Sequence, residues 1–367
     1  MADVLVLGCG LIGTSIGLAL RQAGQDVLLS DSSPERAAVA VSRGAGRRWE
    51  NGESAALVVA AVPPVTTGQV LSEAQRADLG QTYTHVASVQ SLVQADLESL
   101  RSDLSQIAGG HPLAGRELSG PTAAEASLFV GRPWAVCASS FSSPRAISAV
   151  HALAEACGAV PVDVPIEVHD ASVARLSHLP QVAASALAGL LAAQNASAGV
   201  RFELSGPGLV DSTRLAAGDP ELWTQILSAN AGHVAGPVRA LGERLSGLAD
   251  ELERVQSGEP AAIAALTAFL EEGRRGRDLV PLKRGRASID FSTVRVDVDD
   301  QPGRLAALLT SAGAAGINVE DVHVEHVPGR PRGVIELLVR ADAAQALATA
   351  LTESEWAVQE QLPPPAR

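Results

Sequence analysis

The sequence predicts three consecutive parts: an α/β domain built on a mostly parallel sheet, an all-helical domain and a small domain of βαββαβ order. Three observations predict this division. Short apolar runs alternate with longer amphipathic or Ala-rich stretches over residues 1–165, which is the rhythm of βα units. From about residue 166 to 273 the β-branched runs vanish and helical patterns take over. Over residues 286–367 strand and helix patterns alternate again.

The first part contains seven short apolar runs that read as strands. They lie at residues 4–7, 27–30, 57–62, 85–87, 107–109, 134–138 and 160–164. The stretches between most of them are long enough for the helical crossovers that parallel strands need. We therefore expect a mostly parallel sheet.

The second part carries clear helix signals. Asp219-Pro220-Glu221 is typical of a helix start, with an N-cap, a proline at the first helical position and an acid in the first turn. Pro180 should kink the preceding helix or begin a new one. Glycine, proline and basic residues mix at residues 273–286, where we place a linker. A solvated connector is the expected role of this linker, and an anion- or nucleic-acid-contacting patch is the alternative.

Composition argues against several classes of protein. Of the 367 residues 46% are hydrophobic, so the chain can bury more than one core, and a net charge of −13 argues against nucleic acid as the main partner. The N-terminus lacks the basic region of a secretory signal. The longest Ala/Leu stretch, residues 182–193, is shorter than the roughly 20 apolar residues of a membrane span. Three widely spaced cysteines argue against disulfides or zinc. We expect a cytoplasmic protein without metal or membrane contact.

The first strand leads into a glycine-rich turn. The stretch "VLVLGCGLIGTSIGLAL" places Gly8, Gly10 and Gly13 at the end of a strand and the opening of a helix. This context is typical of a Rossmann-like dinucleotide-binding domain, in which the glycines let the backbone approach the pyrophosphate. The helix N-terminus, at Leu11 and Ile12, would offer N–H groups to the phosphates.

The second strand ends at an acid, Asp31. A carboxylate at this place accepts hydrogen bonds from the ribose hydroxyls and repels a 2′-phosphate, so we expect NAD rather than NADP. The alternative is an ordinary acid in the turn before a helix.

His111 is the candidate acid–base group. It follows the run at residues 107–109, at the sheet edge where the carboxyl ends of strands face the cofactor crevice. A nicotinamide enzyme that oxidises an alcohol or cyclohexadienol needs a group to accept the hydroxyl proton, and histidine has a suitable pKa. The alternative is a histidine that caps a turn by bonding its own backbone.

Four stretches resemble, in order and spacing, the prephenate/arogenate dehydrogenase family of tyrosine biosynthesis. They are "THVASVQS" at 84–91, "GGHPLAGRELSG" at 109–120, "HDASVARLSHLPQVAASAL" at 169–187 and "DSTRLAAGDPELW" at 211–223. The resemblance covers about residues 3–285. It implies an NAD-binding domain over residues 1–165 and a helical substrate and dimerisation domain over residues 166–285.

The resemblance also implies roles for single residues. His111 would accept the proton of the substrate's 4-hydroxyl while hydride passes to NAD and the ring carboxylate leaves as carbon dioxide. Ser88 would orient this histidine and touch the cofactor, or simply cap a helix. Arg214 would grip a substrate carboxylate, or simply form a surface ion pair. His178 and Gln181 share a helical face and would point into the cleft between domains, unless His178 is a core or second-layer histidine.

Some positions depart from the family pattern. His85 and Gln90 stand where Asp and Lys are common around the serine, so one positive group expected near the cofactor or substrate is missing. Gln181 stands where a second histidine is common. Arg116 follows "HPLAG", and we hypothesise that it partly replaces the lost lysine in substrate binding; a surface ion pair with Glu117 is the alternative.

The dipeptide His169-Asp170 precedes the helix of His178. We expect Asp170 to cap that helix.

Residues 296–325 resemble an ACT regulatory domain, which some family members carry at this end. Gly303 would end a strand-to-helix turn whose helix N-terminus can receive an amino acid's carboxylate, and Asn318 would meet the ligand's polar groups. ACT domains usually pair side by side, so a homodimer is implied, with tyrosine as the expected feedback effector. An ACT domain that only dimerises is the alternative. His323 and Glu325 share a strand face, but two isolated groups do not make a metal site.

The expected activity is the NAD-dependent oxidative decarboxylation of prephenate to 4-hydroxyphenylpyruvate. One alternative is an enzyme of the same fold that acts on arogenate or a 3-hydroxy acid. The other is a catalytically silent regulator that binds NAD and an amino acid.

Overall fold

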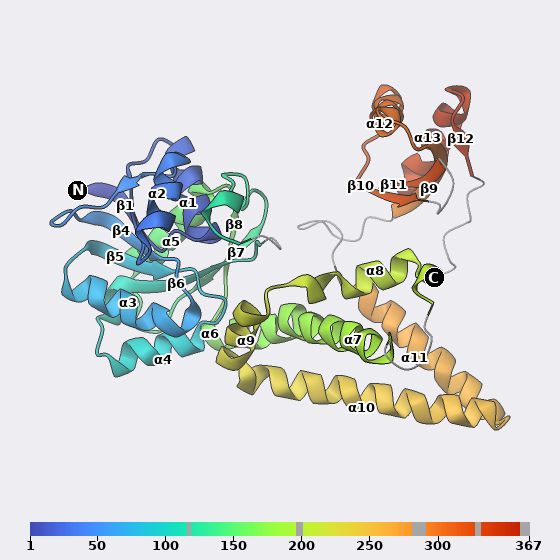
Figure 1. Cartoon of the computed structure of the whole chain (residues 1–367), viewed down its shortest axis with the longest axis horizontal. Coiled ribbons are helices and arrows are strands. Elements are labelled where there is room, and N and C mark those ends of the chain that lie inside the picture. Colours follow the sequence, from blue (N-terminus) through green and yellow to red (C-terminus); the bar gives the residue numbers. More distant parts are fainter. Residues whose placement is uncertain (116–118, 196–200, 281–290, 327–331, 360–367) are drawn as a thin grey trace. The chain divides into compact units, whose positions relative to one another are not determined.

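The structure is a computed structural model of the 367-residue chain, and it describes residues 1–115, 119–195, 201–280, 291–326 and 332–359. The chain forms two compact units, Met1–Glu253 and Arg254–Arg367. Figure 1 labels the elements of both units.

The first unit contains an eight-stranded sheet with strand order β3-β2-β1-β4-β5-β6-β7-β8. Neighbouring strands run parallel except at one place, where β7 is antiparallel to β6. The mostly parallel sheet is therefore confirmed. The strands are β1 (Ala2–Leu7), β2 (Val27–Ser30), β3 (Arg47–Arg48), β4 (Ala55–Ala60), β5 (Gly80–His85), β6 (Ile107–Pro112), β7 (Pro133–Cys137) and β8 (Val160–Asp163).

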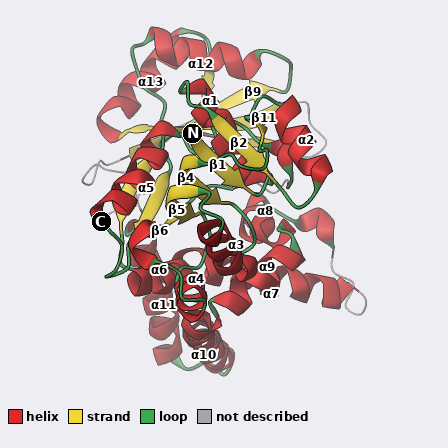
Figure 2. Cartoon of the chain, turned by 90° about the vertical axis from the view of Figure 1, so that its left-hand side faces the viewer, coloured by secondary structure: helices red, strands yellow, loops and turns green. Residues whose placement is uncertain are grey.

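Helices cover both faces of this sheet, as Figure 2 shows. Because side chains alternate along a strand, Val4 and Val6 of β1 face one core and Leu5 faces another. The first core is completed by α1, α2 and α5, and the second by α3 and α4. These helices are α1 (Leu11–Gln22), α2 (Pro34–Ser42), α3 (Pro64–Arg76), α4 (Ser91–Ser99) and α5 (Pro144–Ala156), with 3₁₀ turns at Leu104–Gln106 and Pro121–Ala123.

Two predicted strand positions are wrong. The strand expected at residues 85–87 is β5, which ends at His85, because the polar-looking run "GQTYTH" is buried between β4 and β6. His111 lies inside β6 rather than in the loop after it, because antiparallel pairing with β7 extends the strand through Pro112. Strand β3 has two residues, both arginines, and lacked any apolar signal.

The rest of the first unit is helical, as predicted. It contains α6 (Ile166–Val173), a π-helical turn at Ala174–His178, α7 (Leu179–Asn195), α8 (Pro207–Thr213), α9 (Pro220–Ala229) and α10 (Ala231–Gln256), with 3₁₀ turns at Phe202–Leu204 and Arg214–Ala217. The Asp219 carboxylate accepts hydrogen bonds from the N–H groups of Glu221 (2.8 Å) and Leu222 (3.2 Å), so the predicted N-cap of α9 is confirmed. The π-helical turn ends two residues before Pro180, which lacks the N–H that a regular helix would use there.

The helical run Ile166–Ala193 corrects one expectation. It is 28 residues long and, by length and composition alone, apolar enough to cross a membrane; it is the one such run among the residues that the structure describes. The Ala/Leu stretch judged too short covers only its second half. A single helix of this kind is weak evidence for a membrane span, and its first turns carry the buried polar side chains of His169 and Asp170.

The second unit begins at Arg254, in the last turn of α10, and continues with α11 (Pro260–Asp278). The predicted linker is therefore helical at its start; the remainder of it, from residue 281, lies outside the described residues. Arginines favour helix and suit its last turn, which explains this continuation. The elements that follow are β9 (Phe291–Asp299), α12 (Arg304–Ala314), β10 (Asp321–His326), β11 (Arg332–Arg340), α13 (Ala341–Glu353) and β12 (Ala357–Val358). They form an antiparallel sheet of order β10-β11-β9-β12, which confirms the βαββαβ prediction.

Candidate active site

The glycine-rich turn joins β1 to α1 tightly on one side and leaves space on the other. Gly8 has a φ of +103°, and a Cβ there would overlap the Ala61 carbonyl. A Cβ at Gly13 would overlap the carbonyl of Gly8, whereas one at Gly10 would have no atom within 4 Å. A side chain is therefore excluded at Gly8 and Gly13, where the turn packs closely. The turn is open at Gly10, beside the N–H groups of the first turn of α1.

Asp31 connects this turn to the end of β2. Its carboxylate is partly exposed and accepts hydrogen bonds from the N–H groups of Cys9 (2.6 Å) and Ser33 (2.8 Å). Cys9 itself is buried, and burial together with the nearby Asp31 charge raises the pKa of its thiol to about 12. The thiol therefore stays neutral, which fits a small buried side chain. The turn and this carboxylate fit a dinucleotide.

His111 lies near the carboxyl end of β6 and meets a second histidine there. Its Nδ1 is 2.9 Å from Nε2 of His169 in α6, and the two rings meet edge to face with centroids 5.1 Å apart. The two residues are 58 positions apart in sequence.

His169 is held in turn by its neighbour Asp170. Its Nδ1 lies 2.8 Å from the Asp170 carboxylate, which also accepts hydrogen bonds from the N–H groups of Gln90 (2.9 Å) and Ser91 (2.8 Å). Burial alone would raise the pKa of Asp170, but these hydrogen bonds outweigh it and lower the pKa to about 2. Asp170 was expected to cap the helix of His178. That expectation is wrong, because Asp170 lies inside α6 and its carboxylate binds the first N–H groups of α4.

His178 is buried in the π-helical turn beside Asn230, the residue that ends α9. The Asn230 amide nitrogen donates a hydrogen bond to the Asp170 carbonyl (2.9 Å) and lies 3.2 Å from Nδ1 of His178. The His178 ring also meets Trp223 edge to face, with centroids 6.1 Å apart. Burial lowers the pKa of His178, so its ring is neutral.

His111 and His85 are neutral as well. Burial, reinforced by the neighbouring His169, lowers the pKa of His111 to about 3 and that of His85 to about 4. The lone pair of a neutral imidazole is available to accept a proton. Chemically, His111 is therefore a neutral proton acceptor.

The two departures in the "THVASVQS" stretch have structural roles here. Gln90 is buried, and its amide nitrogen donates hydrogen bonds to the carbonyls of Ala87 (2.7 Å) and Gly110 (3.3 Å). Nδ1 of His85 accepts a hydrogen bond from the N–H of Ala87 (3.3 Å). Gln90 therefore ties the turn between β5 and α4 to β6, and His85 stabilises that turn from within.

Other predicted residues are not brought into this cluster. Ser88 lies in the same turn, but within the described parts of the chain no hydrogen bond joins it to His111. Gln181 is buried in α7, and its amide donates a hydrogen bond to the Ser185 hydroxyl (3.4 Å). Arg214 is exposed on a 3₁₀ turn that packs along α7. Arg116 lies outside the described residues.

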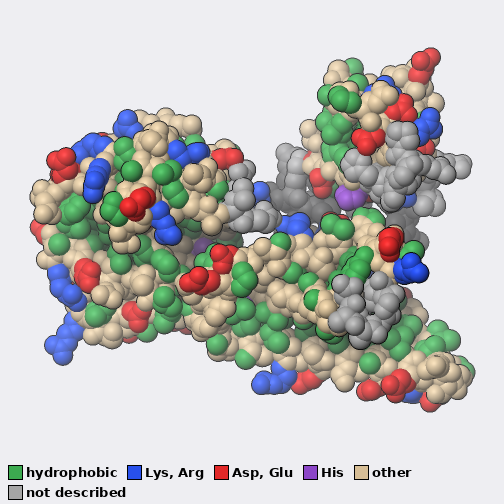
Figure 3. Space-filling view, in the orientation of Figure 1, with side chains coloured by type: hydrophobic (Ala, Val, Ile, Leu, Met, Phe, Trp, Pro, Cys, Tyr) green, Lys and Arg blue, Asp and Glu red, His purple; other side chains and the backbone are tan. Residues whose placement is uncertain are grey.

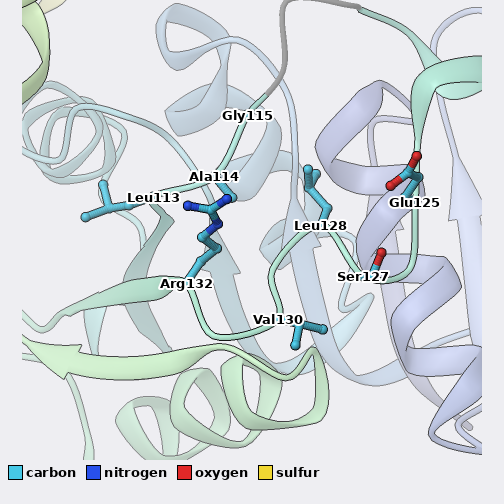
Figure 4. A pocket seen from close by; sticks show the side chains of 8 residues that line it. All are labelled: Leu113, Ala114, Gly115, Glu125, Ser127, Leu128, Val130 and Arg132. Carbon is cyan, nitrogen blue, oxygen red and sulfur yellow. The ribbon is translucent and has the colours of Figure 1, made fainter. Parts of the chain in front are cut away.

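A pocket of about 400 Å³ lies next to the loop that follows β6 (Figure 4). The Arg132 guanidinium in this pocket points toward Ala114. The residues that line it are Leu113, Ala114, Gly115, Glu125, Ser127, Leu128, Val130 and Arg132. None of these residues belongs to the histidine cluster.

Comparisons with known proteins identify the family of the chain. Residues 16–163 match the model of the nucleotide-binding domain of prephenate dehydrogenase, and residues 165–264 match its dimerisation domain. The chain is 35% identical over 364 residues to the probable prephenate dehydrogenase NovF of Streptomyces niveus, covering 97% of this chain and 99% of the relative. The chain belongs to the prephenate dehydrogenase family.

Two further relatives extend the comparison. The prephenate dehydrogenase of Bacillus subtilis is 24% identical over 349 residues, covering 92% of each chain. The crystal structure of the Aquifex aeolicus prephenate dehydrogenase, a complex with hydroxyphenyl propionate and NAD+, superposes with a TM-score of 0.65 at 25% identity, covering 75% of this chain and 98% of that one. Family membership and the glycine-rich turn establish this chain as an NAD-dependent oxidoreductase.

The sequence analysis did not predict a role in the site for two residues of the cluster, Asn230 and His169. Asn230 carried no signal beyond its place at the end of a helix, and only its burial reveals it. His169 was noted, but as part of a helix start. The spacing of His169, Asp170 and His178 is compatible with one connected cluster, but their distance to β6 could not be read from the sequence.

Proposed function

We propose that this protein catalyses the NAD-dependent oxidative decarboxylation of prephenate to 4-hydroxyphenylpyruvate. The observation that carries the proposal is His111, a neutral imidazole at the end of β6, on the same sheet edge as the glycine-rich turn. In this function His111 accepts the proton of the substrate's 4-hydroxyl, and the ring becomes aromatic as carbon dioxide leaves.

Residues of the first domain would hold the cofactor. The backbone from Gly8 to Gly13, including Leu11 and Ile12, would bind the pyrophosphate, and Asp31 would bind the ribose. Bound NAD supplies the hydride acceptor. Asp31 repels a 2′-phosphate, which supports NAD over NADP, and Ser88 lies in the β5–α4 turn at the same edge.

Four side chains are assigned to the substrate. Arg214 would bind a carboxylate, since a planar guanidinium makes paired hydrogen bonds to one. His178 and Gln181 lie one helical turn apart on the segment that enters the cluster and would contact the substrate from that side. Arg116 would supply a further positive charge in place of the missing lysine.

The C-terminal βαββαβ fold supports an ACT domain that binds tyrosine as a feedback inhibitor. Gly303 has a φ of +85° and precedes the first turn of α12, where a carboxylate would be received. Asn318 is exposed before β10, and its amide donates a hydrogen bond to Glu320 (2.7 Å). A domain that only dimerises would leave activity unchanged by tyrosine.

A homodimer in the cytoplasm is the expected form of the enzyme. Residues 165–264 match a dimerisation domain. The helices α7 and α10 carry exposed apolar side chains, visible as green in Figure 3, of a kind that a second copy would cover. They include Leu187, Leu190, Leu245 and Leu252. The domain boundaries that we propose remain 1–165, 166–285 and 286–367.

One assay tests the activity, the cofactor and the regulation. NADH or NADPH formation is followed with prephenate and with arogenate, with NAD and with NADP, in the presence and absence of tyrosine. We expect turnover of prephenate with NAD and inhibition by tyrosine. Turnover of arogenate alone would change the substrate and keep the reaction class. Melting shifts with NAD but no reduced cofactor from either substrate would mean that the protein is a silent regulator.

A further inference from the structure

The hydrogen bonds behind His111 determine which of its nitrogens carries the proton. Nδ1 of His111 lies 2.9 Å from Nε2 of His169, and Nδ1 of His169 lies 2.8 Å from the Asp170 carboxylate. That carboxylate also accepts hydrogen bonds from two backbone N–H groups, so it is ionised and can only accept. His169 must therefore donate a hydrogen bond from Nδ1 to Asp170.

Two arrangements of protons satisfy this requirement. If His169 is neutral, its Nε2 accepts a hydrogen bond from Nδ1–H of His111, and Nε2 of His111 keeps a free lone pair. If His169 is a cation, it donates from both nitrogens, and His111 carries its proton on Nε2, where it cannot act as a base.

The surroundings favour the neutral arrangement. His169 is only 3% exposed, and removing a charged imidazole from water is costly. A positive charge on His169 would oppose charges on His85 and His111, and the Asp170 carboxylate 2.8 Å away already accepts hydrogen bonds from two backbone N–H groups.

We propose that His169, held by Asp170, is a positioning residue that keeps Nε2 of His111 free to accept the substrate's proton. The inference rests on the proposed function, because it concerns the base of that reaction. When His111 acts, the substrate O–H bond breaks and an N–H bond forms at Nε2. The positive charge on the ring then strengthens its Nδ1–H bond to His169, behind which the Asp170 carboxylate lies. An acid in a Ser-His-Asp triad holds its histidine in the same manner.

The backbone of the α/β domain supports this arrangement. Asp170 belongs to α6, but two of its partners, Gln90 and Ser91, are at the start of α4. The orientation of His169 is therefore tied to the domain that carries His111. Ser88, expected from the family to orient His111, makes no hydrogen bond to it among the described residues, which leaves His169 as the partner of Nδ1.

The first experiment needs no substrate or cofactor. The full-length chain is labelled with ¹⁵N in its imidazole rings, and the two ring nitrogens of each histidine are distinguished by NMR at about pH 8, where histidines are ordinarily neutral. His111→Asn identifies the signals of His111. We expect Nδ1 of His111 to be protonated and its Nε2 to be unprotonated. A His111 ring that is protonated on Nε2 and unprotonated on Nδ1 would overturn the proposal.

The second experiment compares two substitutions by kinetics. His169→Phe keeps a ring but cannot accept a hydrogen bond, whereas the amide oxygen of His169→Gln can. We expect His169→Phe to lower kcat roughly 10²–10⁴-fold with little change in KM, and His169→Gln to recover at least about tenfold of that loss. The matched control is His151→Phe on α5, where the histidine pairs with the exposed Asp163, and it should leave kcat unchanged.

The outcomes separate this proposal from the proposed function. Wild-type kcat in folded His169→Phe, judged by circular dichroism, would overturn the positioning role while the function stands. Should His169→Phe fail to fold, His169→Gln and the NMR of the wild-type chain decide. A wild-type enzyme that turns over neither prephenate nor arogenate contradicts the proposed function, whereas the NMR result still tests the hydrogen-bond arrangement.

Discussion

The buried Asp170 carboxylate stabilises the fold through the same contacts that hold His169. Its hydrogen bonds from His169, Gln90 and Ser91 lower its pKa from 3.8 to about 2 in spite of burial, which alone would raise it. A carboxyl group with a lower pKa in the folded chain contributes stability above its unfolded pKa and loses it as the pH falls toward the folded value. The difference corresponds to about 2.5 kcal/mol.

Asp170→Asn removes this charge with little change in size. We expect the free energy of unfolding at neutral pH to fall by about 2.5 kcal/mol, because the amide cannot replace a carboxylate that accepts from three groups. Urea unfolding measures the change, at equal protein concentration since assembly shifts apparent stability. Hydrogen exchange over residues 88–97 should become faster, because the amides of Gln90 and Ser91 lose their acceptor.

The control and the pH dependence make the test specific. Asp163→Asn removes an acid that is 73% exposed and pairs with His151, and such a pair contributes at most about 1 kcal/mol. The difference in stability between the wild-type chain and the Asp170→Asn variant should shrink as the pH falls from 3.8 toward 2, since the wild-type carboxylate is then protonated too. Equal urea midpoints for wild type and Asp170→Asn at neutral pH would refute the reasoning.

Three further predictions concern the base, the cofactor turn and acid stability. His111→Asn should lower kcat roughly 10²–10⁴-fold with little change in KM, because the ring acts on the reacting proton; near-normal turnover would mean that another group is the base. Gly13→Ala would force a methyl group into a backbone carbonyl and should weaken NAD binding at least about tenfold by calorimetry; unchanged affinity would contradict the assignment of this turn to NAD. Burial lowers the pKa of His85 from 6.5 to about 4, so the unfolded chain binds more protons between these values and stability decreases as the pH falls through them, by at most about 3 kcal/mol. His85→Asn should flatten this loss, measured as melting temperature across the range, and an unchanged slope would count against it.

Local patterns predicted the elements whose apolar side chains repeat regularly. Strands β1, β2 and β4 were found because valine and leucine runs are typical of strands buried on both faces. Strand β5 was misplaced because its threonines and Tyr83 look like a partly exposed segment. It is central only because β4 and β6 pair with it on both sides, and that tertiary context overrides intrinsic preference.

The cofactor turn could be predicted and the histidine cluster could not. Gly8, Gly10 and Gly13 lie close together in sequence, in the single turn between β1 and α1. Their spacing alone therefore predicts the shape of the phosphate-binding turn. The contact between His111 and His169 depends on how α6 packs beside β6, across 58 positions of sequence. An Asp near the start of a helix usually caps that helix, so the sequence favoured the wrong partner for Asp170.

The cluster presents two histidines with opposite hydrogen-bonding roles. The Asn230 amide nitrogen lies against Nδ1 of His178 and donates to the Asp170 carbonyl, so the neutral His178 ring carries its proton on Nε2 and can donate from there. His111, whose Nδ1 proton is directed to His169, can accept at Nε2. Because burial lowers the pKa of both rings, neither supplies the positive charge that a substrate with two carboxylates requires. In the proposed function that charge would come from Arg214, whose turn packs along α7, and His111 would take up the proton.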